Sequence, residues 1–181
     1  MNVRKAVVTV FALCLLSSIT LLARSARTAG NSADEDDIRE AVLRYQMLTW
    51  GEEGDKAVKE ATNQNEKAVA EALNFVVLFI SVDSKDPSDA FMKRFEKFPK
   101  PVKKLSQSEI DTKSMNAVVD KATGEKGIRF GVGKIRWLGS NSVEVDGGYF
   151  CAGLCASGQT FNVHRKQGVW KVVGSTMHWI S

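Results

Sequence analysis

The chain of 181 residues is hydrophobic at 44% of its positions and charged at 25%, which is the balance of a folded domain and excludes a disordered protein. Its formal net charge is +4, but four basic residues and no acidic residue lie in residues 1–30, so that 21 basic and 21 acidic residues remain after this segment. The positive charge therefore does not indicate nucleic-acid binding, because nucleic-acid-binding domains carry a basic patch of their own. Only Lys100–Lys104 is locally basic, and such lysines are typical of a protected edge strand.

The first thirty residues have the pattern of a targeting segment. Arg4 and Lys5 precede a mostly apolar run at 6–22, and small residues follow at 23–30. This order predicts a secretory signal peptide and an exported protein, periplasmic or secreted. An uncleaved anchor is the alternative, because the run approaches the roughly 20 residues that span a bilayer. If the segment stays uncleaved, we expect membrane contact only through residues 6–22. In either case we expect a single domain at 31–181.

The residues after this segment show three patterns that are typical of helices. Ser32–Glu35 has the form of a capping box, and apolar residues then recur at helical spacing, which predicts an amphipathic helix that ends near Trp50 and Gly51. The segment 55–73 is rich in Ala, Lys and Glu and predicts one long or two short surface helices. At 86–95 an aspartate, a proline and two phenylalanines predict a short helix with Asp86 as its N-cap.

The second half of the chain has the pattern of β-strands. The apolar run 75–82 predicts a strand covered on both faces. Strands are then expected at 102–106, 117–120, 128–138, 142–155, 159–165 and 169–180. Turn residues at 139–141, 157–158 and 167–168 separate the last four, which favours an antiparallel meander.

Glycines indicate that this sheet bends. The apolar alternation changes parity across Gly131–Gly133, which predicts a β-bulge, and Gly147–Gly148 supplies a second flexible point. The fold class predicted is therefore α+β, with N-terminal helices packed in a strongly curved antiparallel sheet.

This arrangement resembles the NTF2-like cone, also called the SnoaL-like or cystatin-like superfold. More closely, RYQM at 44–47, DPSDAFMKRF at 86–95 and the segment from GGYFCAGLCASG to MHWIS at 147–181 are similar to a family of small exported bacterial proteins, many of them from acidobacteria and cyanobacteria. The superfold includes enzymes, ligand carriers and assembly domains, so the resemblance implies a fold rather than an activity. It supplies no catalytic residue.

Cys151 and Cys155 are the most distinctive pair of residues in the chain. In one continuous strand they would lie roughly 13 Å apart, whereas a disulfide needs Cα atoms within about 7 Å, so a bond requires the strand to break at Gly153. Export favours a disulfide, and two free apolar thiols are the alternative. A metal or redox centre has little support, because the two histidines fit no standard zinc spacing; we expect no metal and no cofactor.

A few residues are candidates for chemistry or binding. Asp146, His164 and His178 are candidate acid–base residues, although each also fits an ordinary structural role. Aromatic side chains that can line an apolar cavity are Tyr45, Trp50, Trp137, Tyr149 and Trp179.

These residues favour a protein without chemistry of its own that binds a small apolar or amphipathic molecule or a protein partner. A cyclase or isomerase of the SnoaL type, with an acid–base residue inside the cone, is one alternative. A module that assembles into a homodimer through an open sheet face is another.

Overall fold

A computed structural model describes residues 32–67 and 73–181, and Ser32–Ser181 forms one compact unit. The predicted signal peptide or anchor at 1–30 lies outside the described residues, as does part of the predicted helical segment 55–73. Within the described ranges, no helix combines the length and apolar character needed to cross a membrane.

The first predicted helix is longer than the sequence indicated. Helix α2 spans Ser32–Glu60 and continues through Gly51 and Gly54, so the predicted end near Trp50 is wrong. A glycine costs a helix about 1 kcal/mol relative to alanine, which is too little to end it when strong helix formers follow at 52–60. Ion pairs one turn apart also stabilise the helix, among them Glu40 Oε1 to Arg44 Nε at 2.7 Å.

Six strands form the main sheet, in the spatial order β2-β1-β5-β6-β7-β8. Their bounds are β1 Val77–Val82, β2 Val102–Lys104, β5 Gly127–Gly139, β6 Ser142–Ala152, β7 Cys155–Lys166 and β8 Val169–Ile180. The run from β5 to β8 is the predicted antiparallel meander, but β1 pairs in parallel with both β2 and β5. The sheet is therefore mixed, since the long connections after β1 allow the chain to return in the same direction.

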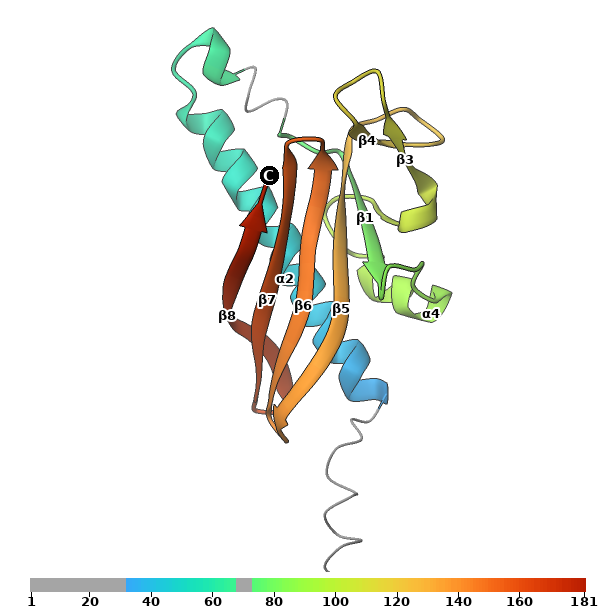
Figure 1. Cartoon of the computed structure of the whole chain (residues 1–181), viewed down its shortest axis with the longest axis vertical. Coiled ribbons are helices and arrows are strands. Elements are labelled where there is room, and N and C mark those ends of the chain that lie inside the picture. Colours follow the sequence, from blue (N-terminus) through green and yellow to red (C-terminus); the bar gives the residue numbers. More distant parts are fainter. Residues whose placement is uncertain (1–31, 68–72) are drawn as a thin grey trace, which may run out of the picture. The chain divides into compact units, whose positions relative to one another are not determined.

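Two layers cover the two faces of this sheet. Helix α2 crosses one face, behind β5 to β8 in Figure 1, and inserts Ile38, Val42, Leu43 and Met47 into the main core. A small hairpin of β3 (Ser108–Asp111) and β4 (Ala117–Asp120) covers part of the opposite face, where Val118 packs on Val77 and Phe79. We call the face that α2 covers the helix face and the other the outer face.

The chain between β1 and β2 forms the predicted short helix with a different cap. Helix α4 spans Asp89–Met92, with a 3-10 turn at Lys93–Phe95, and Ser88 Oγ accepts the N-cap hydrogen bond from the Phe91 amide at 3.1 Å. The predicted cap Asp86 instead accepts a bond from the Ser106 amide at 2.8 Å. The two phenylalanines of this segment, Phe91 and Phe95, are buried.

Strand registers confirm one predicted bulge and reveal others. The pairing of β5 with β6 shifts between Val132 and Ile135, where the change of parity placed a bulge. In β8 the pairing skips Val173 and His178, so Trp170 and Val172 face the helix whereas Thr176 faces outward. Strict alternation along β8 would place these three residues on one face, and the skipped residues prevent it.

Candidate functional site

A row of small residues crosses the outer face of the sheet. Five successive strands, β1, β5, β6, β7 and β8, contribute residues that are partners in register: Ser81, Gly131, Gly148, Gly158 and Trp179. The predicted turn at 157–158 is wrong, because both residues lie inside β7. Because three neighbouring strands carry no side chain at this level, the row forms the floor of a groove.

At two of these positions only glycine fits, because neighbouring atoms lie too close to its Cα to leave room for a Cβ atom. A Cβ atom added at Gly148 would lie 2.0 Å from the carbonyl oxygen of Ser157, on the adjacent strand. One added at Gly158 would lie 2.3 Å from the indole nitrogen of Trp179, so the indole lies directly over this glycine. The floor is therefore fixed by backbone contact, and Trp179 forms one end of the groove.

The groove above this row has a volume of about 420 Å³. Apolar side chains of Leu105, Phe150 and Trp179 border it, and Ser81 and Ser84 lie at the end formed by β1 and its following turn. Ser84 and the preceding Asp83 both have positive φ, 60° and 50°, which turns the chain tightly after β1. The mixture of an apolar border and a few polar groups is typical of ligand sites.

Arg129 supplies a positive charge to the same groove. It precedes Gly131 by two residues on β5, and its Nε donates to Ser108 Oγ of the hairpin at 2.8 Å. Within residues 32–67 and 73–181 this is the only hydrogen bond of its side chain, and no carboxylate pairs with it. Burial lowers the pKa of Arg129, although the guanidinium still carries its charge at neutral pH.

A polar cluster borders the opposite side of the groove. Arg136 donates to Asp146 Oδ2 at 2.7 Å and to Glu144 Oε2 at 3.2 Å, and Thr160 bridges Asp146 to His178 Nε2, which lies 2.7 Å from its hydroxyl. The Arg136 guanidinium, followed by smaller contributions from Thr160 and His178, lowers the pKa of Asp146. The structure thus brings Asp146 and His178 into one network.

His164 lies apart from this network. It pairs in register with Ser142 and Lys171, four residues along β7 from Thr160, which corresponds to roughly 13 Å along a strand. The two histidines share the outer face but do not meet. In the part of the chain that the structure describes, no cluster of His, Cys, Asp and Glu is arranged to hold a metal ion.

The predicted aromatic residues do not line one cavity. Trp50 packs edge-on against Tyr149 at 4.6 Å between ring centroids, Trp137 packs against Trp170 at 5.7 Å, and Tyr45 against Phe161 at 6.1 Å. These contacts belong to the helix face, where the cavity beside Trp50 measures about 20 Å³, no more than one water molecule. Of the five predicted residues only the Trp179 indole lies over the floor of the groove. Tyr149 is among the residues that line the groove on β6, but its ring packs on the helix face.

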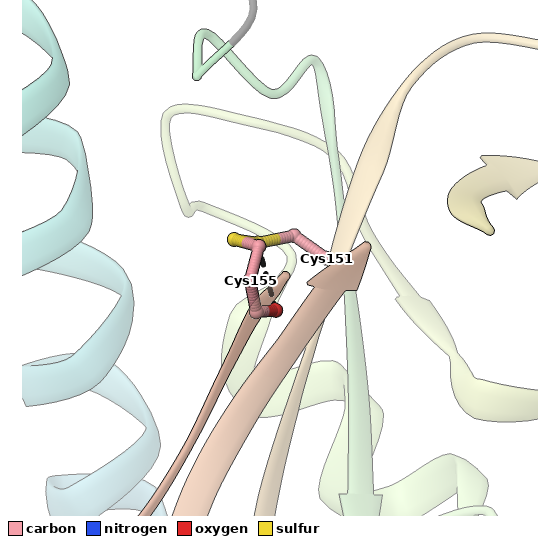
Figure 2. Close-up of a disulfide and its surroundings, with 2 residues drawn as sticks. All are labelled: Cys151 and Cys155. Carbon is pink, nitrogen blue, oxygen red and sulfur yellow. Dashed lines mark hydrogen bonds between the residues drawn. A yellow bond between two sulfur atoms is a disulfide. The ribbon is translucent and has the colours of Figure 1, made fainter. Parts of the chain in front are cut away.

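Cys151 and Cys155 form a disulfide at the end of the β6–β7 hairpin (Figure 2). Their Cα atoms are 5.3 Å apart, because β6 ends at Ala152 and β7 begins at Cys155, with the turn at Gly153 and Leu154. The predicted single strand 142–155 is therefore wrong, and the break at Gly153 that a disulfide requires is present. The bond closes one end of the hairpin that carries Gly148 and Gly158.

Sequence reasoning missed Arg129 and most of the groove floor. Arg129 lies in an ordinary strand pattern, and Gly158 was assigned to a turn because Ser-Gly pairs often form one. Glycines spaced along separate strands give no local signal, since only the register brings them together. The one available indication was the number of glycines inside otherwise regular strands, which often marks a close approach of a ligand or of another backbone.

Comparison of the chain with family models, curated proteins and solved structures returned no match. We therefore infer its function from the groove itself.

Proposed function

We propose that this protein is a non-catalytic, exported binding protein whose outer-face groove takes a small, flat, amphipathic molecule. The observation that carries the proposal is the row Ser81, Gly131, Gly148, Gly158 and Trp179, which leaves a floor of bare backbone between apolar walls. Such a floor lets a planar group approach the sheet closely. Trp179 is 55% exposed, so a ligand that stacks on the indole removes apolar surface from water.

The state of Asp146 favours binding over catalysis. A general base works best when its pKa is close to the operating pH, whereas Arg136 and Thr160 lower the pKa of Asp146. Both carboxylate oxygens already accept hydrogen bonds, from Arg136 and from Thr160. The cyclase or isomerase alternative would need a carboxylate in an apolar pocket, where burial raises the pKa.

The NTF2-like cone stays a proposal about ancestry and shape. Bulges in β5 and β8 would bend the sheet around α2, in support of it. The parallel β1–β5 pairing and the filled helix face are features that a hollow cone would lack, so we propose a variant in which the outer face binds the ligand. Export and the resemblance to small exported bacterial proteins are likewise proposed.

Assembly is a second candidate, because β8 is an edge strand with exposed apolar side chains. Val173, Met177 and Ile180 are 48%, 51% and 64% exposed. Exposed apolar surface on a sheet edge favours pairing with another chain. Native mass spectrometry separates this candidate from the first, since it detects a dimer mass and a retained small molecule in the same spectrum.

Binding of the neutral fluorophore N-phenyl-1-naphthylamine to the full chain tests the main proposal. We expect Trp179→Ala to weaken binding about tenfold by removing the stacking surface. Gly133→Leu should weaken it similarly, since a Cβ there meets nothing closer than 3.7 Å and the side chain can fill the groove without disturbing the sheet. Leu154→Ala is the control, because Leu154 is 78% exposed and lies outside the groove.

Background binding to the apolar run at 6–22 is common to all variants and cancels in the comparison. If both groove variants bind the fluorophore as the wild type does, while thermal unfolding shows that they are folded, the groove is not the site.

A further inference from the structure

The charges around the groove are balanced with one exception. Asp146 is paired with Arg136, and on the hairpin side Asp120 is paired with Lys103. Arg129 lies on β5, where its register partners are Phe79 on β1 and Phe150 on β6. Among the described residues it is the cation of the groove that has no carboxylate partner.

The surroundings of Arg129 make this lack of a partner costly. Phe79 is fully buried on one side, Phe150 is partly buried on the other, and the β3–β4 hairpin covers the guanidinium through Ser108. A charge taken partly out of water loses solvation that only an opposite charge or several hydrogen bonds restore. The Arg129 guanidinium has five N–H donors. Ser108 Oγ accepts from one of them, so four remain for a ligand or for water.

The remaining donors belong to a residue that lines the groove. Arg129 and Gly131 are two residues apart on β5 and project to the same face, roughly 6.6 Å apart along the strand. An anionic group bound by Arg129 would therefore lie at the edge of the glycine floor, with space for an apolar body extending toward Trp179. Planar guanidinium groups bind carboxylate and phosphate oxygens in pairs, which fixes the direction of the ligand.

We propose that the ligand is an anionic amphiphile, and that Arg129 binds its carboxylate, phosphate or sulfonate head while the glycine floor and Trp179 hold its apolar body. This inference rests on the proposed function, because it specifies the ligand class of the same groove. It assigns to Arg129 a recognition role that the sequence pattern did not indicate.

Two probes with the same aromatic body test it. N-Phenyl-1-naphthylamine is neutral, and 8-anilinonaphthalene-1-sulfonate adds one sulfonate. We expect the wild-type full chain to bind the sulfonate roughly tenfold more tightly, as for one charged hydrogen-bonded contact. Arg129→Gln should remove that preference, so that the two probes bind with similar affinity. Lys171→Gln is the matched control, because it removes the same charge from an exposed position on β8 outside the groove.

The outcomes separate this inference from the proposed function. If neither probe binds through the groove, as judged by the Trp179→Ala variant, the proposed function fails and this inference fails with it. If the neutral probe binds there but the sulfonate gains nothing, or keeps its advantage in Arg129→Gln, the assignment of Arg129 alone is overturned.

Competition against the neutral probe then identifies the head group. Dodecanoate and dodecyl phosphate are compared with the uncharged dodecanol, which has the same chain. Displacement by either anion at roughly tenfold lower concentration than by dodecanol supports the assignment, and the more effective of the two names the head group. Equal displacement by all three contradicts it.

Discussion

Replacement of Gly148 by alanine tests the close packing of the groove floor. The new Cβ would lie 2.0 Å from the Ser157 carbonyl oxygen, whereas a carbon approaches such an oxygen in sheets to about 3.3 Å. Relief of this clash requires β6 and β7 to separate by roughly 1.3 Å, which breaks backbone hydrogen bonds between the two strands beside the Gly148–Gly158 pair. Two lost bonds cost about 3 kcal/mol, and the reduced entropy of the unfolded chain offsets about 0.5 kcal/mol.

We therefore expect Gly148→Ala to lower the free energy of unfolding by about 2–3 kcal/mol. The same change elsewhere supplies matched controls. At Gly174, inside β8, a Cβ meets no atom within 4 Å, so alanine should stabilise the protein by about 0.5 kcal/mol. At Gly131 the nearest atom is Ser81 Oγ at 3.3 Å, the end of a side chain that can rotate, so the two effects should nearly cancel.

Urea unfolding followed by tryptophan fluorescence measures all three variants. An unchanged dependence on urea concentration would show that each substitution alters stability rather than the compactness of the unfolded state. The reasoning would be refuted if Gly148→Ala and Gly174→Ala unfolded within 0.5 kcal/mol of each other, a spread of the size expected for unremarkable surface changes. The glycine row would then be a loosely packed feature, and its use as a binding floor would lose its structural basis.

Two further changes test other parts of the fold. Asp120 is 1% exposed and pairs with Lys103, so Asp120→Asn should cost about 2 kcal/mol, less than for a fully buried pair because Lys103 is partly exposed. The hydrogen bond from Lys103, then that from the Ala122 amide, lowers the pKa of Asp120 in the folded protein. Its contribution is therefore present above the unfolded-state pKa near 4 and is lost as the pH falls through the lower folded value. Urea midpoints from pH 6 to pH 3 should fall more steeply for the wild type than for Asp120→Asn, and parallel curves would contradict the pairing. Replacement of Cys151 and Cys155 by alanine should lower the free energy of unfolding by about 2 kcal/mol, the loop entropy of a five-residue ring, and an unchanged midpoint would indicate that the thiols are free in solution.

Local patterns predicted the elements better than their pairing. The α+β class, the meander of β5 to β8 and the bulge after Val132 follow from side-chain alternation, which depends only on neighbouring residues. The errors at Trp50 and at 157–158 share a cause. In both cases a glycine was assigned the end or turn that it often makes, although the surrounding contacts kept the element continuous. The turn between β6 and β7 was therefore expected at 157–158, whereas the chain reverses at Gly153 and Leu154.

Local sequence patterns were enough to identify most helical and extended segments, and to show that Cys151 and Cys155 can bond only where the strand breaks. Tertiary structure alone decided that β1 runs parallel to β5, and that Gly131, Gly148 and Gly158 meet in one row. It also decided that Arg129 faces this row without a carboxylate partner among the described residues. The physical reason is that side-chain periodicity is a property of each strand, whereas register, which sets what lies beside each residue, depends on the packing of all strands together.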